Sequence, residues 1–222
     1  MITSPQNPKL RLFRGLLSSR RRREREGLFA CEGEDLLEAA RAAGIEPVEV
    51  LVAGEDVEPA LLAELSTLGH PPRVVSAFRR EDLPSGYRDA VLALWRVADP
   101  GNVGTLLRAA DAFGASVALS AGCADVTGPR ALRASAGAVF RVPLGRFDEA
   151  PGRRVALDAH AGKPLGQVDL TPPLVLVLGA ERDGLPELGS AERATIPLPG
   201  DAESLNVAMA GTIALYELSR RS

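Results

Sequence analysis

An unbroken apolar run, Leu-Val-Leu-Val-Leu at residues 174–178, constrains the fold more than any other feature of this sequence. A strand with one face in water alternates apolar and polar residues, so a strand of this kind is covered on both faces. Strand and helix patterns alternate around it, and they lie at residues 90–97, 103–113, 117–120, 129–137, 155–158, 194–198 and 205–218. The alternation predicts an α/β fold in which a parallel sheet carries helices on both faces.

The first part of the chain predicts a smaller α/β unit. Apolar residues recur at helical spacing with arginines on the other side, which indicates an amphipathic helix; they are Leu10, Phe13, Leu16 and Leu17. Further strand and helix patterns lie at residues 28–31, 35–43, 48–52, 59–68 and 73–76. Residues 79–89 are polar and contain Pro-Ser-Gly, as linkers do. We therefore place a domain boundary near residue 88, between residues 1–88 and residues 89–222.

Length and composition exclude several classes of protein. A chain of 222 residues with 45% apolar residues can bury a full core. No apolar run is long enough to span a bilayer, and the N-terminus lacks the apolar core of a signal peptide, so we expect a cytoplasmic protein without membrane contact. The cysteines and histidines follow no disulfide or metal-binding spacing. No dinucleotide, nucleoside triphosphatase or hydrolase motif is present either.

The positive charge is concentrated at one end, although the whole chain carries a net charge of −3. Residues 1–25 hold eight of the 26 cationic side chains and one of the 29 anionic ones, which leaves 18 cations against 28 anions elsewhere. A basic arm on an acidic body is what a protein that grips phosphate groups locally would carry. Arg11 and Arg22 are the nucleic-acid contacts we expect in this arm. The alternative is a solvated helix face.

Glycines and polar residues gather just beyond three of the apolar runs, where open α/β sheets build ligand sites. In the first such segment, residues 99–110, Asn102 stands at the position of a helix N-cap. Gly104 and Arg108 are four residues apart and so share one helix face, where the glycine leaves room for another chain or a nucleotide. A capped helix with a solvated arginine explains the same residues, and both interpretations stay open.

The second and third segments have the same character. Gly179 and Gly184 permit backbone conformations that a side chain would block, and Glu181 can accept hydrogen bonds from a loop or a ligand. Ser204 and Asn206 stand at the start of the last predicted helix, which fits helix capping as well as a site. Capping alone rarely needs both residues.

In order, spacing and residue identity, the three segments resemble motifs 1, 2 and 3 of the SpoU (TrmH-like) class of SPOUT methyltransferases, over residues 90–220. The resemblance implies that a methyl group passes from S-adenosylmethionine to a ribose 2′-hydroxyl of RNA. It also implies a deep trefoil knot in the C-terminal chain and a homodimer whose active sites lie at the interface, with Arg108 acting across it.

The resemblance also assigns residues to the site. It implies that the catalytic residues are Asn102, Arg108, Glu181, Ser204 and Asn206, with Glu181 organising the loops. The residues that it implies around the cofactor are Leu178, Gly179, Gly184, Ile196, Leu198 and Leu205. Ala208 stands where the family often has serine.

The chemistry of Arg108 leaves two roles open. The family's members are held to use this arginine as a general base, yet a guanidinium is normally protonated at physiological pH and accepts protons poorly. The side chain either takes the proton of the 2′-hydroxyl, or stays charged, anchors a phosphate and stabilises the developing alkoxide. We expect Arg108 to be essential in both cases.

The N-terminal part resembles the small ribosomal-protein-like RNA-binding domain that precedes many SpoU-class catalytic domains, through residues 2–8, the arginine-rich helix and residues 29–40. Residues 129–141 resemble another stretch near the substrate, so Arg130 and Arg133 are expected RNA contacts, with a solvated helix face as the alternative. Because related tRNA enzymes commonly lack the added domain, ribosomal RNA is the favoured substrate. The alternatives are a tRNA 2′-O-methyltransferase and a knotted RNA-binding protein without catalysis.

Overall fold

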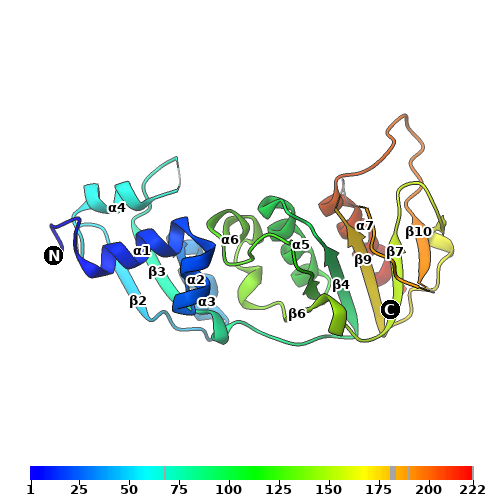
Figure 1. Cartoon of the computed structure of the whole chain (residues 1–222), viewed down its shortest axis with the longest axis horizontal. Helices are drawn as coiled ribbons and strands as arrows, with labels where there is room; N and C mark the ends of the chain where they lie inside the picture. The colour runs from blue at the N-terminus through cyan, green and yellow to red at the C-terminus, as the bar shows by residue number, and fades with distance from the viewer. Residues whose placement is uncertain (68, 181–183, 190, 222) are drawn as a thin grey trace.

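The computed structural model describes residues 1–67, 69–180, 184–189 and 191–221, and it contains two sheets (Figure 1). The first sheet lies toward the N-terminal end of an elongated molecule, and the second fills the other end. No helix in the described ranges is long and apolar enough to cross a membrane. Four short 3-10 turns join the larger elements in these ranges: η1 (Arg80–Asp82), η2 (Ala138–Phe140), η3 (Phe147–Glu149) and η4 (Leu165–Gln167).

The first sheet is antiparallel, with the strand order β1-β3-β2. The helix α1 (Pro8–Ser18) buries all four of the apolar residues that share its helical spacing, which confirms the predicted amphipathic helix. The other elements of this unit are β1 (Leu28–Glu32), α3 (Glu34–Ala42), β2 (Glu49–Val52), α4 (Pro59–Leu65) and β3 (Val74–Arg79).

The arginine-rich segment forms a helix of its own, α2 (Arg20–Glu26), which the apolar spacing did not separate from α1. Ser19 is extended, with φ −134° and ψ 117°, and this conformation ends the first helix. Its hydroxyl accepts a hydrogen bond from the amide of Arg22 at 3.3 Å, as an N-cap does. Gly27 then ends α2 in the left-handed region, at φ 64°.

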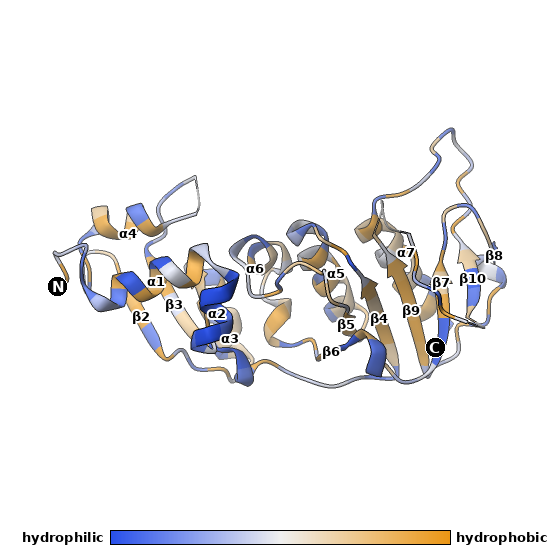
Figure 2. Cartoon of the chain, in the orientation of Figure 1, coloured by the Kyte–Doolittle hydropathy of each residue, from blue (hydrophilic) through white to orange (hydrophobic). Residues whose placement is uncertain are grey.

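The second sheet has seven strands in the order β6-β5-β4-β9-β7-β10-β8, and every neighbouring pair is parallel, which confirms the predicted parallel sheet. The apolar run at residues 174–178 forms most of the central strand β9 (Leu174–Gly179); these five residues are buried, and Figure 2 shows the strand in the hydrophobic colour. The strands β6 and β8 were not predicted, because strands of two or three residues leave no pattern in the sequence. The other strands are β4 (Ala90–Trp95), β5 (Ser116–Leu119), β6 (Leu144–Arg146), β7 (Arg153–Leu157), β8 (Lys163–Pro164) and β10 (Glu192–Thr195).

Both faces of this sheet are covered, but not both by α-helices. On one face, α5 (Pro100–Ala112) and α7 (Val207–Ser219) pack on β4 and β9. The opposite face is covered by η3 and by Leu185 and Leu188. Among the residues that the structure describes, no α-helix packs on this second face, so the prediction of helices on both faces is wrong there: the connection between β6 and β7 is short and holds only η3.

The two sheets are joined by a shared core. Phe29 of β1, Phe78 of β3 and Phe140 of η2 form a ring cluster with centroids 5.3 to 6.1 Å apart. A Cβ atom on Gly137, just before η2, would lie 2.5 Å from the Cβ of Ala39 on α3, so the backbones approach closely there. The helix α6 (Pro129–Ser135) lies between the first sheet and α5 (Figure 1).

Candidate active site

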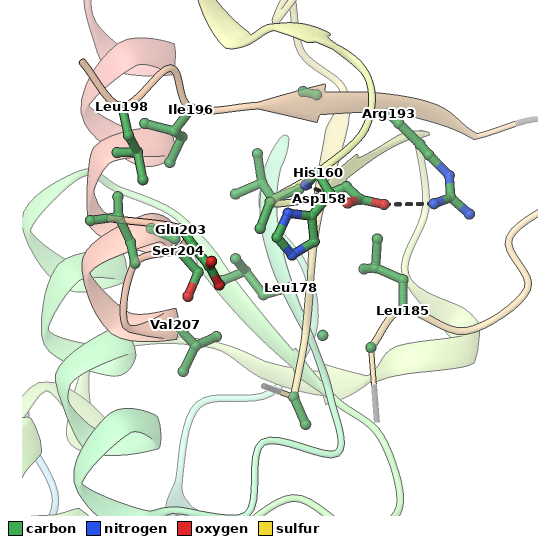
Figure 3. A pocket seen from close by; sticks show the side chains of 18 residues that line it. Asp158, His160, Leu178, Leu185, Arg193, Ile196, Leu198, Glu203, Ser204 and Val207 are labelled. Atoms are coloured by element: carbon green, nitrogen blue, oxygen red, sulfur yellow. Dashed lines mark hydrogen bonds and ion pairs between the residues drawn. The ribbon is translucent and has the colours of Figure 1, made fainter. Parts of the chain in front are cut away.

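A cavity of about 460 Å³ opens at the edge of the parallel sheet where β7 and β9 end and the chain leaves β10 (Figure 3). The carboxyl ends of parallel strands are where open α/β sheets place ligands, and this volume suits a small molecule. The residues that line the cavity are Leu157, Asp158, Ala159, His160, Leu178, Gly179, Ala180, Gly184, Leu185, Arg193, Ala194, Ile196, Leu198, Glu203, Ser204, Leu205, Val207 and Ala210.

All six residues that were expected around the cofactor lie on this cavity: Leu178, Gly179, Gly184, Ile196, Leu198 and Leu205. Two of them were expected within a strand at residues 194–198, but β10 ends at Thr195. Pro197 and Pro199 lack the amide that strand pairing needs, so the chain leaves the sheet here. Ile196 and Leu198 therefore reach the cavity from the segment that follows the strand (Figure 3).

The glycines of the second motif allow two backbone segments to meet. A Cβ atom on Gly179 would lie 2.2 Å from the carbonyl oxygen of Gly184, a contact that no side chain tolerates. Gly184 adopts φ +64°, and its amide donates to the carbonyl of Ala180 at 3.0 Å. The amide of Ala180 in turn donates to the carbonyl of Trp95 at 3.0 Å, which ties this turn to the end of β4.

Asp158 follows β7, and its carboxylate is held by several hydrogen-bond donors at the cavity. Its carboxylate accepts hydrogen bonds from the amide of His160 at 2.9 Å and from the guanidinium of Arg193 at 2.6 Å. The His160 amide first, and then Arg193, hold the pKa of Asp158 below its ordinary value against the opposing effect of burial. Asp158 was not predicted as a site residue. It closes a predicted strand, and this position at a strand end was the available signal.

Glu203, Ser204 and His160 point into the same space from two sides of the cavity (Figure 3). Ser204 was expected in the catalytic centre, and the structure places it on the cavity wall beside the apolar residues. Glu203 and His160 were not expected there. Neither belongs to a helix or strand, so no periodicity marked them.

A hydrogen bond joins the first and third motifs. The Nδ2 atom of Asn206 donates to Oδ1 of Asn102 at 3.1 Å, while Oδ1 of Asn206 accepts from the amide of Ala208 at 2.9 Å and caps α7. Asn102 was expected as the N-cap of its helix, and this expectation is wrong. The cap is Asp99, whose Oδ1 accepts from the Asn102 amide at 2.8 Å, because the helix begins three residues earlier than predicted, at Pro100.

The first motif also differs from expectation at Gly104. Its missing side chain makes room for α6, because a Cβ atom there would lie 2.4 Å from the carbonyl oxygen of Ala131. The close approach is thus made by this chain and not by a nucleotide or another chain. Arg108 is exposed on α5 and does not line the cavity. Glu181 lies outside the described residues.

The arginines that were expected to contact RNA have different surroundings. Arg11 is exposed on α1, and Arg22 lies 3.1 Å from the carboxylate of Glu26. Arg130 lies 3.8 Å from Asp99, and both side chains are exposed. Arg133 donates to the hydroxyl of Thr67 at 2.8 Å and pairs with Glu32 at 3.5 Å, so it already has partners in the chain.

The family to which the chain belongs follows from a comparison with family models. The SpoU rRNA Methylase family matches residues 89–216, more than half of the chain and all three motifs. The chain belongs to this family. The matched range includes all residues that line the cavity and the hydrogen-bonded pair Asn102 and Asn206.

Relatives of this SpoU family member extend over its whole length. A 23S rRNA (guanosine(2553)-2′-O)-methyltransferase RlmP of Bacillus subtilis is 30% identical, over 98% of this chain and 98% of its own. A 23S rRNA (uridine(2479)-2′-O)-methyltransferase of Streptomyces viridochromogenes is 30% identical, over 99% of this chain and 92% of its own. The crystal structure of the SpoU methyltransferase AviRb from Streptomyces viridochromogenes, in complex with the cofactor AdoMet, superposes with a TM-score of 0.86 at 27% identity, covering 97% of this chain and 98% of that one.

Proposed function

We propose that this protein transfers a methyl group from S-adenosylmethionine to a ribose 2′-hydroxyl of ribosomal RNA. The observation that carries the proposal is the convergence of motifs 2 and 3 on one cavity of about 460 Å³, next to the asparagine pair that ties in motif 1. The relatives named as 23S rRNA 2′-O-methyltransferases match nearly end to end, and two neighbouring structures contain AdoMet.

Ribosomal RNA is favoured over tRNA by the extent of the matches. A structure described as concerned with 2-OH methylation of C/U34 on tRNA covers only 60% of this chain, although the match covers 95% of that chain, with a TM-score of 0.55. The two named 23S rRNA relatives instead include the N-terminal unit. They act on different nucleotides, a uridine and a guanosine, so the proposal extends to the class of RNA and not to the base.

The lining of the cavity fits S-adenosylmethionine. Leu178, Ile196, Leu198 and Leu205 supply apolar walls for an adenosine, and the close backbone turn of Gly179 and Gly184 leaves a surface without side chains. When bound, the cofactor supplies the methyl group on a positively charged sulfur. The chain's own contribution is to exclude water around it and to orient it.

We propose catalytic positions for the polar residues next to this cavity. Ser204 faces the cavity, and the Asn102–Asn206 pair holds the start of α7 against α5, the helix that carries Arg108. Arg108 then serves the 2′-oxygen either as base or as a cation that stabilises the developing negative charge. We propose that Glu181 is the remaining catalytic residue and that it organises the loops around the active site.

A homodimer fits the exposed surface of α7. Met209, Ile213 and Tyr216 are 61%, 39% and 52% exposed, and their spacing puts them on one side of this helix. A second copy on this side would cover the apolar stripe and bring its own residues near Arg108 on the neighbouring α5. Sedimentation tests this, because Ile213→Asp should then give a monomer.

We also propose the knot and the role of the N-terminal unit. The placement of β9 between β4 and β7, with α7 returning to β9 and α5, supports a deep trefoil knot, which tracing of the chain in a crystal structure would test. The basic arm on the first sheet supports an RNA-binding unit in residues 1–88, with Arg11 and Arg22 as its proposed contacts, while Arg130 and Arg133 of α6 are proposed contacts from the second part of the chain. Arg11 and Arg130 are the two of these that are exposed.

The experiment that tests the proposal is transfer of label from methyl-labelled S-adenosylmethionine to unmodified ribosomal RNA and, separately, to unmodified tRNA. We expect label in ribosomal RNA. Label in tRNA alone would overturn the substrate class. Absence of label from both RNAs, together with absence of cofactor binding, would favour a knotted RNA-binding protein without catalysis.

A further inference from the structure

The arginines of α2 differ in their surroundings. Arg21 and Arg25 are exposed, as the arm of an RNA-binding protein would require. Arg23 is buried, and its guanidinium donates to the carbonyl of Leu16 at 2.7 Å and to the carboxylate of Asp125 at 2.8 Å. The Arg20 guanidinium donates to the carbonyl of Cys123 at 3.3 Å. One side of α2 is thus attached to residues 120–128, which join β5 to α6.

The Asp125 carboxylate, which accepts from Arg23, is buried and held by several donors. Its side chain is 7% exposed and that of Arg23 is 6% exposed, so the ion pair lies out of water. Thr127 donates to the same carboxylate through its hydroxyl at 2.7 Å and its amide at 3.0 Å, and Arg80 lies 3.4 Å away. Burial alone would raise the pKa of Asp125, but the hydrogen bonds from Thr127 and Arg23 lower it below its ordinary value. The carboxylate is therefore fixed by groups from both units of the chain.

The other side of residues 120–128 is bonded to the strand that leads into motif 1. The amide of Ala124 donates to the carbonyl of Val97 at 2.9 Å, and the thiol of Cys123 lies 3.3 Å from the carbonyl of Leu94. The hydroxyl of Ser120 accepts from the amide of Arg96 at 2.8 Å. Residues 94–97 immediately precede Asp99 and Asn102. One short segment thus contacts both α2 and the entrance to the first motif.

We propose that Arg23 and Asp125 are positioning residues for RNA methylation, which lock the arginine-bearing helix α2 to the segment that supports motif 1. The arm then does more than bind RNA: it holds bound RNA at a fixed place relative to the active site. Arg23 itself does not touch RNA. This inference rests on the proposed function, because it assigns the arm to the RNA substrate.

The proposal separates binding from reaction. Without the lock, Arg11, Arg21 and Arg25 remain exposed and still bind phosphate groups, so RNA affinity is kept. The bound ribose is then no longer held in line with the methyl group, and misplacement of a reacting group slows reaction steeply. We therefore expect a slower methyl-transfer step with unchanged affinity for RNA and for S-adenosylmethionine.

The test compares Arg23→Met and Asp125→Asn in the full-length protein with the unaltered chain. The measurements are the single-turnover methylation rate of unmodified ribosomal RNA, the RNA dissociation constant and the cofactor dissociation constant. We expect the rate to fall about 10- to 100-fold in both variants, with both dissociation constants within about twofold. Removal of a carboxylate that repelled RNA would instead tighten RNA binding, so Asp125→Asn separates the two explanations by sign.

Leu62→Ala is the control for lost stability, because Leu62 is fully buried in the core of the N-terminal unit, and this core includes no residue of the segment 120–128. This variant should lower the melting temperature and leave the rate with bound RNA unchanged. An unchanged rate in Arg23→Met, or a fall in RNA affinity that accounts for the whole loss of rate, would overturn the proposal. So would a similar loss of rate in Leu62→Ala.

Hydrogen exchange gives a readout that needs no activity. If the lock exists, Arg23→Met should speed exchange of the Ala124 amide, which bonds to Val97. Should the unaltered protein methylate no RNA while this exchange still rises in the variant, the proposed function fails and the lock stands. Unchanged exchange at Ala124 would contradict the lock whatever the activity.

Discussion

The cavity and the α2 attachment hold their charges in different ways. At the cavity, Asp158 pairs with Arg193, whose side chain is 55% exposed, and most of the residues that line the wall are apolar. At α2, the Arg23–Asp125 pair is almost completely buried between the two units of the chain. An exposed pair contributes little to stability because water screens it, whereas loss of one partner from a buried pair leaves an uncompensated charge. Changes at the cavity should therefore act locally, and changes at α2 should act across the molecule.

The largest effect on the rate of methyl transfer is expected at Arg108, which lies neither on the cavity nor at the α2 attachment. Arg108→Ala should lower methyl transfer by about 100-fold or more, because it removes the group that stabilises or deprotonates the 2′-oxygen. Cofactor affinity should stay within about twofold, since Arg108 does not line the cavity. Methylation kinetics and calorimetric titration with S-adenosylmethionine measure the two quantities. Arg41→Ala, an exposed arginine on α3, is the matched control, and full activity of the Arg108 variant would remove it from the site.

A substitution at Gly179 tests whether the cavity acts locally. Gly179→Val would drive a side chain into the carbonyl of Gly184, so we expect cofactor affinity to fall about 10- to 100-fold. RNA affinity should not change, because the arm lies at the other end of the molecule. Gly200→Ala is the control, since a Cβ atom there meets nothing within 4 Å. Equal cofactor affinity in the two variants would place the cofactor elsewhere.

Substitutions in the Asn102–Asn206 pair distinguish helix capping from a role in catalysis. Asn206→Ala removes the cap of α7 as well as the bond to Asn102, so it should cost about 1 kcal/mol of stability and slow methylation. Asn102→Ala leaves both helix caps in place, and we expect about a tenfold slower reaction at nearly unchanged stability. Denaturant unfolding and single-turnover rates distinguish them. A stability loss of similar size in Asn102→Ala would mean that Asn102 acts as a structural group.

The smallest effect is expected at a single exposed arginine of the arm. Arg11→Ala should weaken RNA binding a few-fold and reduce the slope of log affinity against log salt by about 0.7, the value for one contact to single-stranded nucleic acid. Arg23→Met should leave that slope unchanged, because its guanidinium is buried. Filter binding over a series of salt concentrations measures both slopes. An equal change of the salt slope in the two variants would contradict the distinction between exposed arginines that bind RNA and the buried Arg23.

The sequence predicted the central strands and the cavity residues for a local reason. Leu178 and Gly179 end a buried strand, and the position of a strand's end in a parallel sheet follows from the chain direction alone. The N-cap was misplaced by three residues, because Asp99 and Asn102 are both good caps and only the Pro100 ring decides where the helix begins. Short strands such as β8 carried no pattern at all.

The surroundings of the charged residues could not be predicted in the same way. Arg21 and Arg23 are two residues apart and chemically identical, yet one is exposed and the other buried. What separates them is Asp125, which lies 102 positions along the chain from Arg23. A charge cluster in a sequence therefore indicates a basic segment, and tertiary partners decide which of its members remain free to bind phosphate.

The most direct test of the central claim is the position of the transferred methyl group. After incubation with methyl-labelled S-adenosylmethionine, ribosomal RNA is hydrolysed in alkali, which spares only the linkage that follows a blocked 2′-hydroxyl. We predict that the label appears in a single alkali-resistant dinucleotide and is absent with Arg108→Ala. Label released entirely as mononucleotides would show methylation of a base and would contradict ribose 2′-O-methylation.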